Sequence, residues 1–121
     1  MLLLISCAAI GPATGGPEDK QGPFLIYSTP YLGAINIPPS KQVQITFSEP
    51  IDPNSIHASI RIIPETEFKT MVRKNILTII PKNNWNKDLA TRIIINRNVR
   101  DFQNNIMDSP INIIFSTSNT I

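Results

Sequence analysis

The sequence predicts an all-β sandwich, and three observations lead to that fold class. From Phe24 onward, short runs of alternating apolar and polar residues are separated by turn residues, which is the spacing of a small β-sandwich. Ile and other β-branched residues, which suit a pleated and half-buried surface, are abundant. No stretch of about ten residues combines helical periodicity with helix caps. The 41% hydrophobic content is enough for one domain to form a core without disulfides or metals.

About seven strands are expected, one for each alternating run. They cover residues 24–28, 41–48, 57–63, 68–73, 76–80, 91–97 and 111–117. The clearest is 41–48, in which Val43, Ile45 and Phe47 alternate with polar residues and are expected to face the core. A tight turn at residues 74–75 is expected to join the fourth and fifth strands.

The N-terminal residues have a different character. An apolar segment ends in the small residue Ser6 and then Cys7, which is the pattern of a bacterial lipoprotein signal, where a peptidase cuts before a lipid-modified cysteine. The chain has one cysteine, so Cys7 has no internal disulfide partner. We therefore expect residues 1–6 to be a signal peptide, Cys7 to carry lipid, and the Gly/Pro-rich residues 7–22 to be a flexible tether.

Two features of this leader depart from a full secretory signal. No positive charge precedes Cys7, and the apolar stretch is shorter than the usual ~7–15 residues. A truncated leader and an unmodified thiol at Cys7 therefore stay open as alternatives. Whether the chain is a fragment of a longer lipoprotein also stays open.

Composition argues against several classes of function. The charged fraction is 17%, the net charge is +2 and the positive charges are scattered, so the electrostatic footprint of a nucleic-acid-binding protein is missing. No run approaches the ~18 consecutive apolar residues of a membrane-spanning helix, so membrane attachment is expected through the lipid on Cys7. The sequence contains no nucleophile–base pair, phosphate-binding loop or cofactor motif, and we expect a protein without a cofactor that is not an enzyme.

Four motifs in order resemble a known family. They are the strand end 47–52, the hairpin arm 75–81, the turn 101–105 and the closing strand 113–117. Together they are similar to the bacterial Ig-like domain of the SbsA type, and the resemblance covers residues 23–118. It implies a single Ig-like antiparallel β-sandwich over residues 23–121, which serves as a structural spacer or a protein-interaction module.

The leader and the following Gly15–Asp19 resemble the N-terminus of lipoproteins that are common in Bacteroidetes. This resemblance implies an outer-membrane protein, lipid-anchored and facing the periplasm or the cell surface. Its expected partners are the membrane, through the lipid on Cys7, and another envelope protein or an adjacent domain.

Three positions differ from the family pattern. Asn104 replaces the usual Gly of the turn, and we expect it to adopt positive φ, which Asn tolerates best among non-Gly residues. Thr91 replaces an aromatic Tyr, and Trp85 replaces a Leu. We expect the ring of Trp85 to fill the volume that the missing Tyr would have taken.

Turn carboxylates are weak candidates for a metal site. Asp52 and Asp101, with Glu49 near in sequence, could supply some of the six to eight oxygen ligands that Ca²⁺ prefers. The alternative is that Asp52 and Asp101 accept backbone hydrogen bonds within their own turns. Because no dense acidic cluster exists, the second interpretation is favoured and no metal site is predicted.

Two other groups of residues have a binding interpretation and a structural one. Trp85, Phe68 and Tyr27 could form a carbohydrate-stacking surface, although their positions favour core packing. His57 is expected to be a solvated surface residue, opposite in facing to Ala58. A calcium- or carbohydrate-binding surface module therefore remains the alternative function.

Ile94 and Ile114 give the sequence's one indication of a partner surface. Alternation places both side chains on the outer face of consecutive antiparallel strands. Ordinary surface isoleucines explain them equally well, but a contiguous apolar patch marks an interaction surface. The hypothesis is that this face contacts a neighbouring domain or a second protein.

Overall fold

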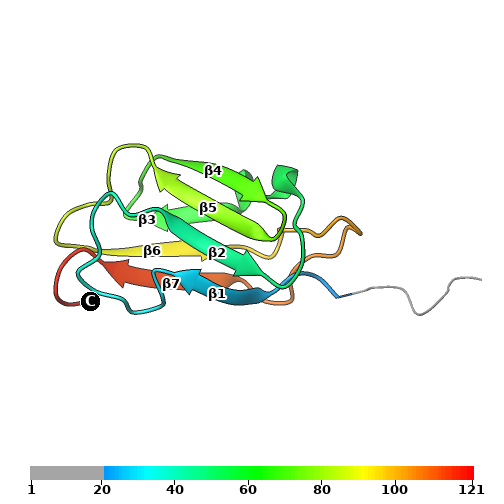
Figure 1. Ribbon diagram of the computed structural model, residues 1–121, viewed down its shortest axis with the longest axis horizontal. Coiled ribbons are helices and arrows are strands. Elements are labelled where there is room, and N and C mark those ends of the chain that lie inside the picture. Colours follow the sequence, from blue (N-terminus) through cyan, green and yellow to red (C-terminus); the bar gives the residue numbers. More distant parts are fainter. Residues whose placement is uncertain (1–20) are drawn as a thin grey trace, which may run out of the picture.

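The computed structural model describes residues 21–121 as two packed β-sheets (Figure 1). The strands are β1 (Leu25–Thr29), β2 (Val43–Phe47), β3 (Ile60–Ile63), β4 (Phe68–Arg73), β5 (Ile76–Pro81), β6 (Ala90–Ile95) and β7 (Ile111–Ser116). The larger sheet has the order β1-β2-β5-β4 and the smaller one β3-β6-β7. Every strand pairing in them is antiparallel. The predicted seven-stranded antiparallel sandwich is confirmed.

The sequence prediction failed for one strand start. The expected strand 57–63 begins only at Ile60, because His57–Ser59 forms the second of two 3₁₀ helices, η2, after η1 (Pro53–Ser55). The Ser59 hydroxyl donates to the carbonyl of Ser55, 2.7 Å away, and such local bonds compete with strand pairing. Ala58, expected to face inward, is therefore exposed.

The core lies between the two sheets and is centred on β2. Val43, Ile45 and Phe47 are fully buried, as the alternation predicts. Trp85, in the loop between β5 and β6, is also buried, and its ring meets Phe115 edge-on at 5.4 Å. Its Nε1 donates to the carbonyl of Lys41 at 2.6 Å, so the one polar atom of the indole is satisfied.

Trp85 and the altered position 91 both adjoin Phe115. Thr91 is buried and pairs across the ladder with Phe115, the residue that Trp85 contacts. The filling of the missing Tyr volume by the indole stays a prediction.

The turns also follow the sequence. Lys74 and Asn104 have positive φ, 57° and 72°, in the hairpin turn between β4 and β5 and in the turn that begins at Asp101. Asn at position 104 keeps the left-handed backbone that the family's Gly supplies.

After β1 the chain crosses from one sheet to the other. The Gly33 amide donates to the carbonyl of Ile114, and the Ser116 amide donates to the carbonyl of Ala34. Ala34 also bridges Phe115 in parallel. Residues 21–40 therefore form one continuous edge of the sandwich, first along the larger sheet and then along β7 (lower side of Figure 1).

Gly22, near the start of the described residues, is tightly packed. Gly22 and Pro23 are buried, and a Cβ on Gly22 would lie 1.8 Å from the carbonyl oxygen of Ile106. That position accepts only glycine unless the backbone moves. The predicted signal peptide 1–6, Cys7 and the tether up to residue 20 lie outside the described residues.

Candidate functional site

Asp101 is the buried carboxylate of the described domain, with 2% of its surface exposed. One oxygen, Oδ1, accepts the backbone N–H groups of Gln103 and Asn105 at 2.9 and 2.8 Å. The other, Oδ2, accepts the Asn105 side-chain amide at 3.1 Å. The side chain of Glu49 makes a further hydrogen bond to it. Internal donors thus use both carboxylate oxygens.

The environment of Asp101 favours its charged form. Burial raises the pKa of this carboxyl, but hydrogen bonds from Asn105, Gln103 and Glu49 outweigh burial and hold the pKa below its ordinary value of 3.8. Asp101 therefore acts as an acceptor of the hydrogen bonds that close its own turn.

Asp52 has a similar local role in the neighbouring turn. Its Oδ1 accepts the backbone N–H of Asn54 at 3.0 Å and caps η1. The two turns are joined, because the Asp52 amide donates to the carbonyl of Arg100 at 2.8 Å. Both metal candidates therefore act as turn-stabilising acceptors, as the favoured interpretation holds.

No group of three His, Cys, Asp or Glu side chains that could hold a metal ion occurs within residues 21–121. In the same range, no helix is long and apolar enough to cross a membrane.

The other predicted residues occupy different surroundings. His57 is exposed and stacks on Phe68 at 4.7 Å, and Phe68 itself packs against the core. Trp85 is buried, as expected. Tyr27, also expected in the core, is 59% exposed.

A β-bulge explains the error at Tyr27. The register of β1 on β2 shifts between Leu25 and Tyr27, so that Tyr27 pairs with Thr46. Thr46 lies on the outer face of β2, opposite in facing to the buried Ile45 and Phe47. One extra residue in a strand turns the following side chains to the other face.

Ile94 and Ile114 lie on the outer face of the smaller sheet, and both are half-buried. They are diagonal neighbours, because Ile94 pairs with Asn112 and Ile114 pairs with Arg92. Diagonal neighbours on one sheet face are about 7–8 Å apart. The expected facing is confirmed, and an interaction at this face stays a prediction.

The exposed apolar residues of the 21–40 edge were missed. Tyr31 and Leu32 are 70% and 64% exposed, and Phe24, Ile26, Tyr27 and Ile35 are exposed as well. The sequence holds one signal for them, since residues 21–40 contain no Asp, Glu, Lys, Arg or His. That gap in charge could have been noticed, but exposure depends on the bulge and the crossover.

Comparison with family models decides the classification. The model described as bacterial Ig-like domain matches residues 19–117. The chain belongs to this family. The resemblance to the SbsA-type domain is thereby confirmed, and the two-sheet topology is that of an Ig-like sandwich. No curated protein sequence matches the chain.

Solved structures share the fold of this Ig-like domain. Domains 1–6 of the surface layer protein SbsC match with a TM-score of 0.57 at 13% identity, over 82% of this chain and 14% of that one. L,D-transpeptidase 3 from Mycobacterium tuberculosis matches with a TM-score of 0.51 at 14% identity, over 76% of this chain and 36% of that one. An LD transpeptidase in complex with imipenem matches with a TM-score of 0.54 at 18% identity, over 78% of this chain and 40% of that one. The chain thus spans well under half of each neighbour.

Proposed function

We propose that this chain is a lipid-anchored protein of the cell envelope, held through Cys7 to the outer membrane. Its Ig-like domain acts as a structural spacer or a protein-interaction module and carries out no reaction. The observation that carries the proposal is the order of parts. A lipoprotein-type cysteine and a Gly/Pro-rich tether stand directly before a domain in which Gly22 is already packed against Ile106.

The tether has a length that suits attachment. Between Cys7 and Gln21 a flexible Gly-rich chain spans on average about 20 Å, and at most about 50 Å when fully extended. The domain would therefore stay close to the membrane surface while keeping freedom to turn.

Two features of the domain support a role without catalysis. Both oxygens of the buried Asp101 accept internal hydrogen bonds, so this carboxylate is occupied in stabilising its turn. The exposed His57 stacks on Phe68, so its ring is held against the surface rather than beside a nucleophile. The fold neighbours include a surface layer protein, which agrees with an envelope location.

The test of the anchor is cell fractionation of Cys7→Ser. The wild type should partition with membranes, and the variant should move to the soluble or unprocessed fraction. Stable anchoring takes at least two acyl chains, and Cys7→Ser removes the residue that would carry them. Ser6→Ala keeps a small residue before the cysteine and is the matched control, which should remain membrane-bound. A soluble wild type, or membrane partitioning that is unchanged by Cys7→Ser, would refute the anchor.

The alternative, a calcium- or carbohydrate-binding module, has its own readout. A ligand that binds only the folded state raises the melting temperature by mass action. A rise with CaCl₂ or with an oligosaccharide, absent with MgCl₂ or a non-binding sugar, would favour that alternative over a purely structural role.

A further inference from the structure

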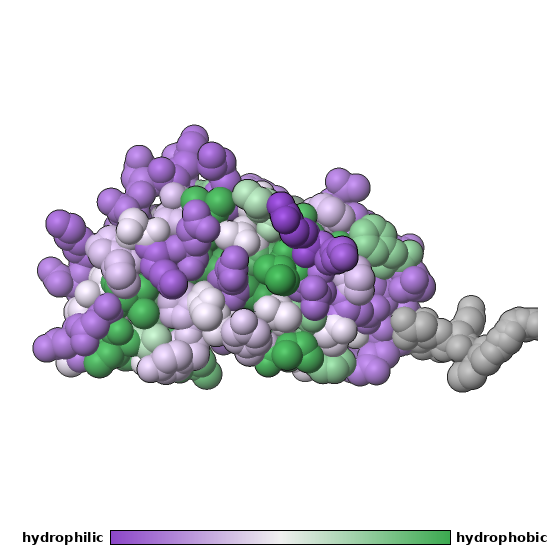
Figure 2. Space-filling model, viewed as in Figure 1, coloured by the Kyte–Doolittle hydropathy of each residue, from purple (hydrophilic) through white to green (hydrophobic). Residues whose placement is uncertain are grey.

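Residues 21–40 form an edge with an unusual composition, here named the uncharged edge. It contains no charged residue in 20 positions. Exposed apolar side chains follow one another along it, namely Phe24, Ile26, Tyr27, Tyr31, Leu32 and Ile35. Figure 2 shows hydrophobic patches on this lower side of the molecule, separated by paler and hydrophilic surface. A group of exposed apolar side chains of this kind is a candidate site of interaction.

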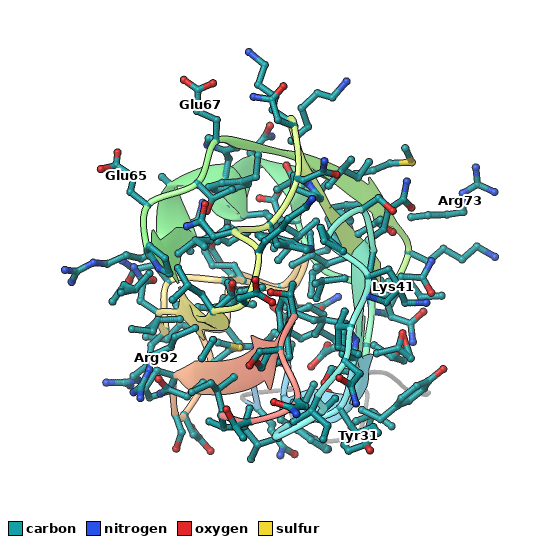
Figure 3. The ribbon with its side chains drawn as sticks, turned by 90° about the vertical axis from the view of Figure 1, so that its left-hand side faces the viewer. Tyr31, Lys41, Glu65, Glu67, Arg73 and Arg92 are labelled. Carbon is teal, nitrogen blue, oxygen red and sulfur yellow. The ribbon has the colours of Figure 1, made fainter. Side chains whose placement is uncertain are left out.

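Several charged side chains of the domain lie away from this edge. Viewed from one end, Tyr31 lies at the lower side, while Glu65 and Glu67 lie at the opposite, upper side (Figure 3). Arg73 and Arg92 project from the two flanks. The molecule therefore has one apolar long edge and one edge that carries carboxylates.

Strand addition is a poor explanation for the uncharged edge. β1 has a bulge at Ile26 and is followed by Pro30, and bulges and prolines are the devices that prevent another strand from pairing with an edge. Beyond the crossover, residues 33–37 already bond to β7. The exposed features are thus side chains, with little free backbone for a partner strand.

The side chains suit the boundary of a lipid bilayer. Tyr and Phe rings are favoured at the membrane–water interface, and the edge has no carboxylate that would be repelled by anionic headgroups. One carboxylate, Asp108, lies nearby in the hollow that Phe24 also lines, where β7 begins. Tyr31 and Leu32 come after β1, beyond that hollow.

We propose that the uncharged edge rests on the lipid surface to which Cys7 anchors the chain, with Tyr31 and Leu32 inserted between headgroups. This inference rests on the proposed function, because the tether holds the edge near the bilayer. A weak intrinsic affinity then suffices, since tethering makes the contact intramolecular. The orientation turns Glu65 and Glu67 away from the membrane.

The test uses the full chain without lipid, so that it does not depend on acylation. In the Cys7→Ser background, Leu32→Cys places a single thiol on the edge, and Met71→Cys places one on β4, where Met71 is 54% exposed. Each is labelled with an environment-sensitive fluorophore and mixed with phosphatidylethanolamine/phosphatidylglycerol vesicles. Emission from position 32 should shift to the blue and brighten, and emission from position 71 should stay as in buffer.

A second arm measures affinity. Tyr31→Asp with Leu32→Asp, in the Cys7→Ser background, should lower vesicle partitioning by at least about tenfold, equivalent to 1.4 kcal/mol, whereas Met71→Asp should leave it unchanged. If the double variant is misfolded by thermal melting, Ile35→Asp replaces it.

Three results would overturn the inference. The first two are equal emission shifts at positions 32 and 71, and no shift at either position. The third is a shift at position 32 that appears without vesicles when the protein concentration is raised. The last would assign the edge to a second copy of this chain. Failure of the anchor is distinguishable, because it appears as an unmodified Cys7 in the wild type and leaves the vesicle result unaffected.

Discussion

The two long edges of the sandwich differ in how they meet their surroundings. The uncharged edge, residues 21–40, has apolar side chains in solvent and no charge. The opposite edge, residues 60–73, has five charged residues, Arg61, Glu65, Glu67, Lys69 and Arg73. Charge on an edge strand discourages pairing with other chains. The charged edge thus carries groups that discourage contact with other chains, and the uncharged edge lacks them.

Both edges depend on one core, and a substitution of Phe47 in that core should have the largest effect on the stability of the domain. Phe47 is fully buried on β2, the strand that pairs with both β1 and β5. Phe47→Ala should lower the free energy of unfolding by about 3–5 kcal/mol, measured by denaturant titration.

Gln44 on the outer face of the same strand is the matched control for Phe47. Gln44→Ala should change the free energy of unfolding by no more than about 0.5 kcal/mol. Equal losses at the two positions would mean that the facing of β2 is misassigned.

The start of the uncharged edge is fixed by Gly22, and changing it should have the next largest effect. Gly22→Ala brings a methyl group against the Ile106 carbonyl, and overpacking of this kind costs about 1–3 kcal/mol. Gly33→Asn is the control, because the space around Gly33 is open and Asn tolerates its positive φ. Gly33→Asn should cost less in thermal melting. The reverse order would place the domain boundary beyond Gly22.

Asp101 differs from the charged residues of the edge 60–73, because its carboxylate is buried inside the domain. Its folded pKa is depressed, so its contribution to stability is present above the unfolded pKa of about 3.9 and is lost as pH falls through the folded value. Asp101→Asn should destabilise the domain at pH 7 and flatten the loss of stability below about pH 4.

Glu49→Gln is the control for the loss of stability at low pH that is assigned to Asp101. The glutamine amide can still donate to Asp101, so the stability of this variant should continue to fall with acid. Parallel stability–pH curves for wild type and Asp101→Asn, in urea titrations from pH 2 to 7, would contradict the assigned role.

The outer face with Ile94 and Ile114 should give the smallest effect on folding. Both are half-buried at the surface and interleaved with Arg92 and Asn112, so replacing both with Thr should leave the fold intact. If this face contacts a second molecule, the double variant should reduce self-association in sedimentation velocity. Unchanged association, or an unfolded variant, would remove this face as an interaction surface.

Strand positions and the core could be predicted from the sequence, because side-chain alternation along β2 and β7 reports burial directly. The prediction failed where a single local event reset the pattern. A bulge turned Tyr27 outward, and the Ser59–Ser55 hydrogen bond replaced the start of β3 with a 3₁₀ helix. Neither event leaves a periodicity to recognise.

The candidate sites were harder to predict than the fold. The sequence identified Asp101 as a turn residue whose donors, Gln103 and Asn105, are local, but the further contact with Glu49, 52 positions earlier, depends on the fold. The uncharged edge is visible as a gap in charge, yet its exposure depends on the crossover that carries residues 33–37 onto β7.

The intact mass of the wild-type protein extracted from cell membranes tests directly whether the chain is anchored by lipid on Cys7. We expect a mature chain that begins at Cys7 and carries diacylglycerol on its sulfur, with residues 1–6 removed. An unmodified thiol at Cys7, with those residues still attached, would contradict it.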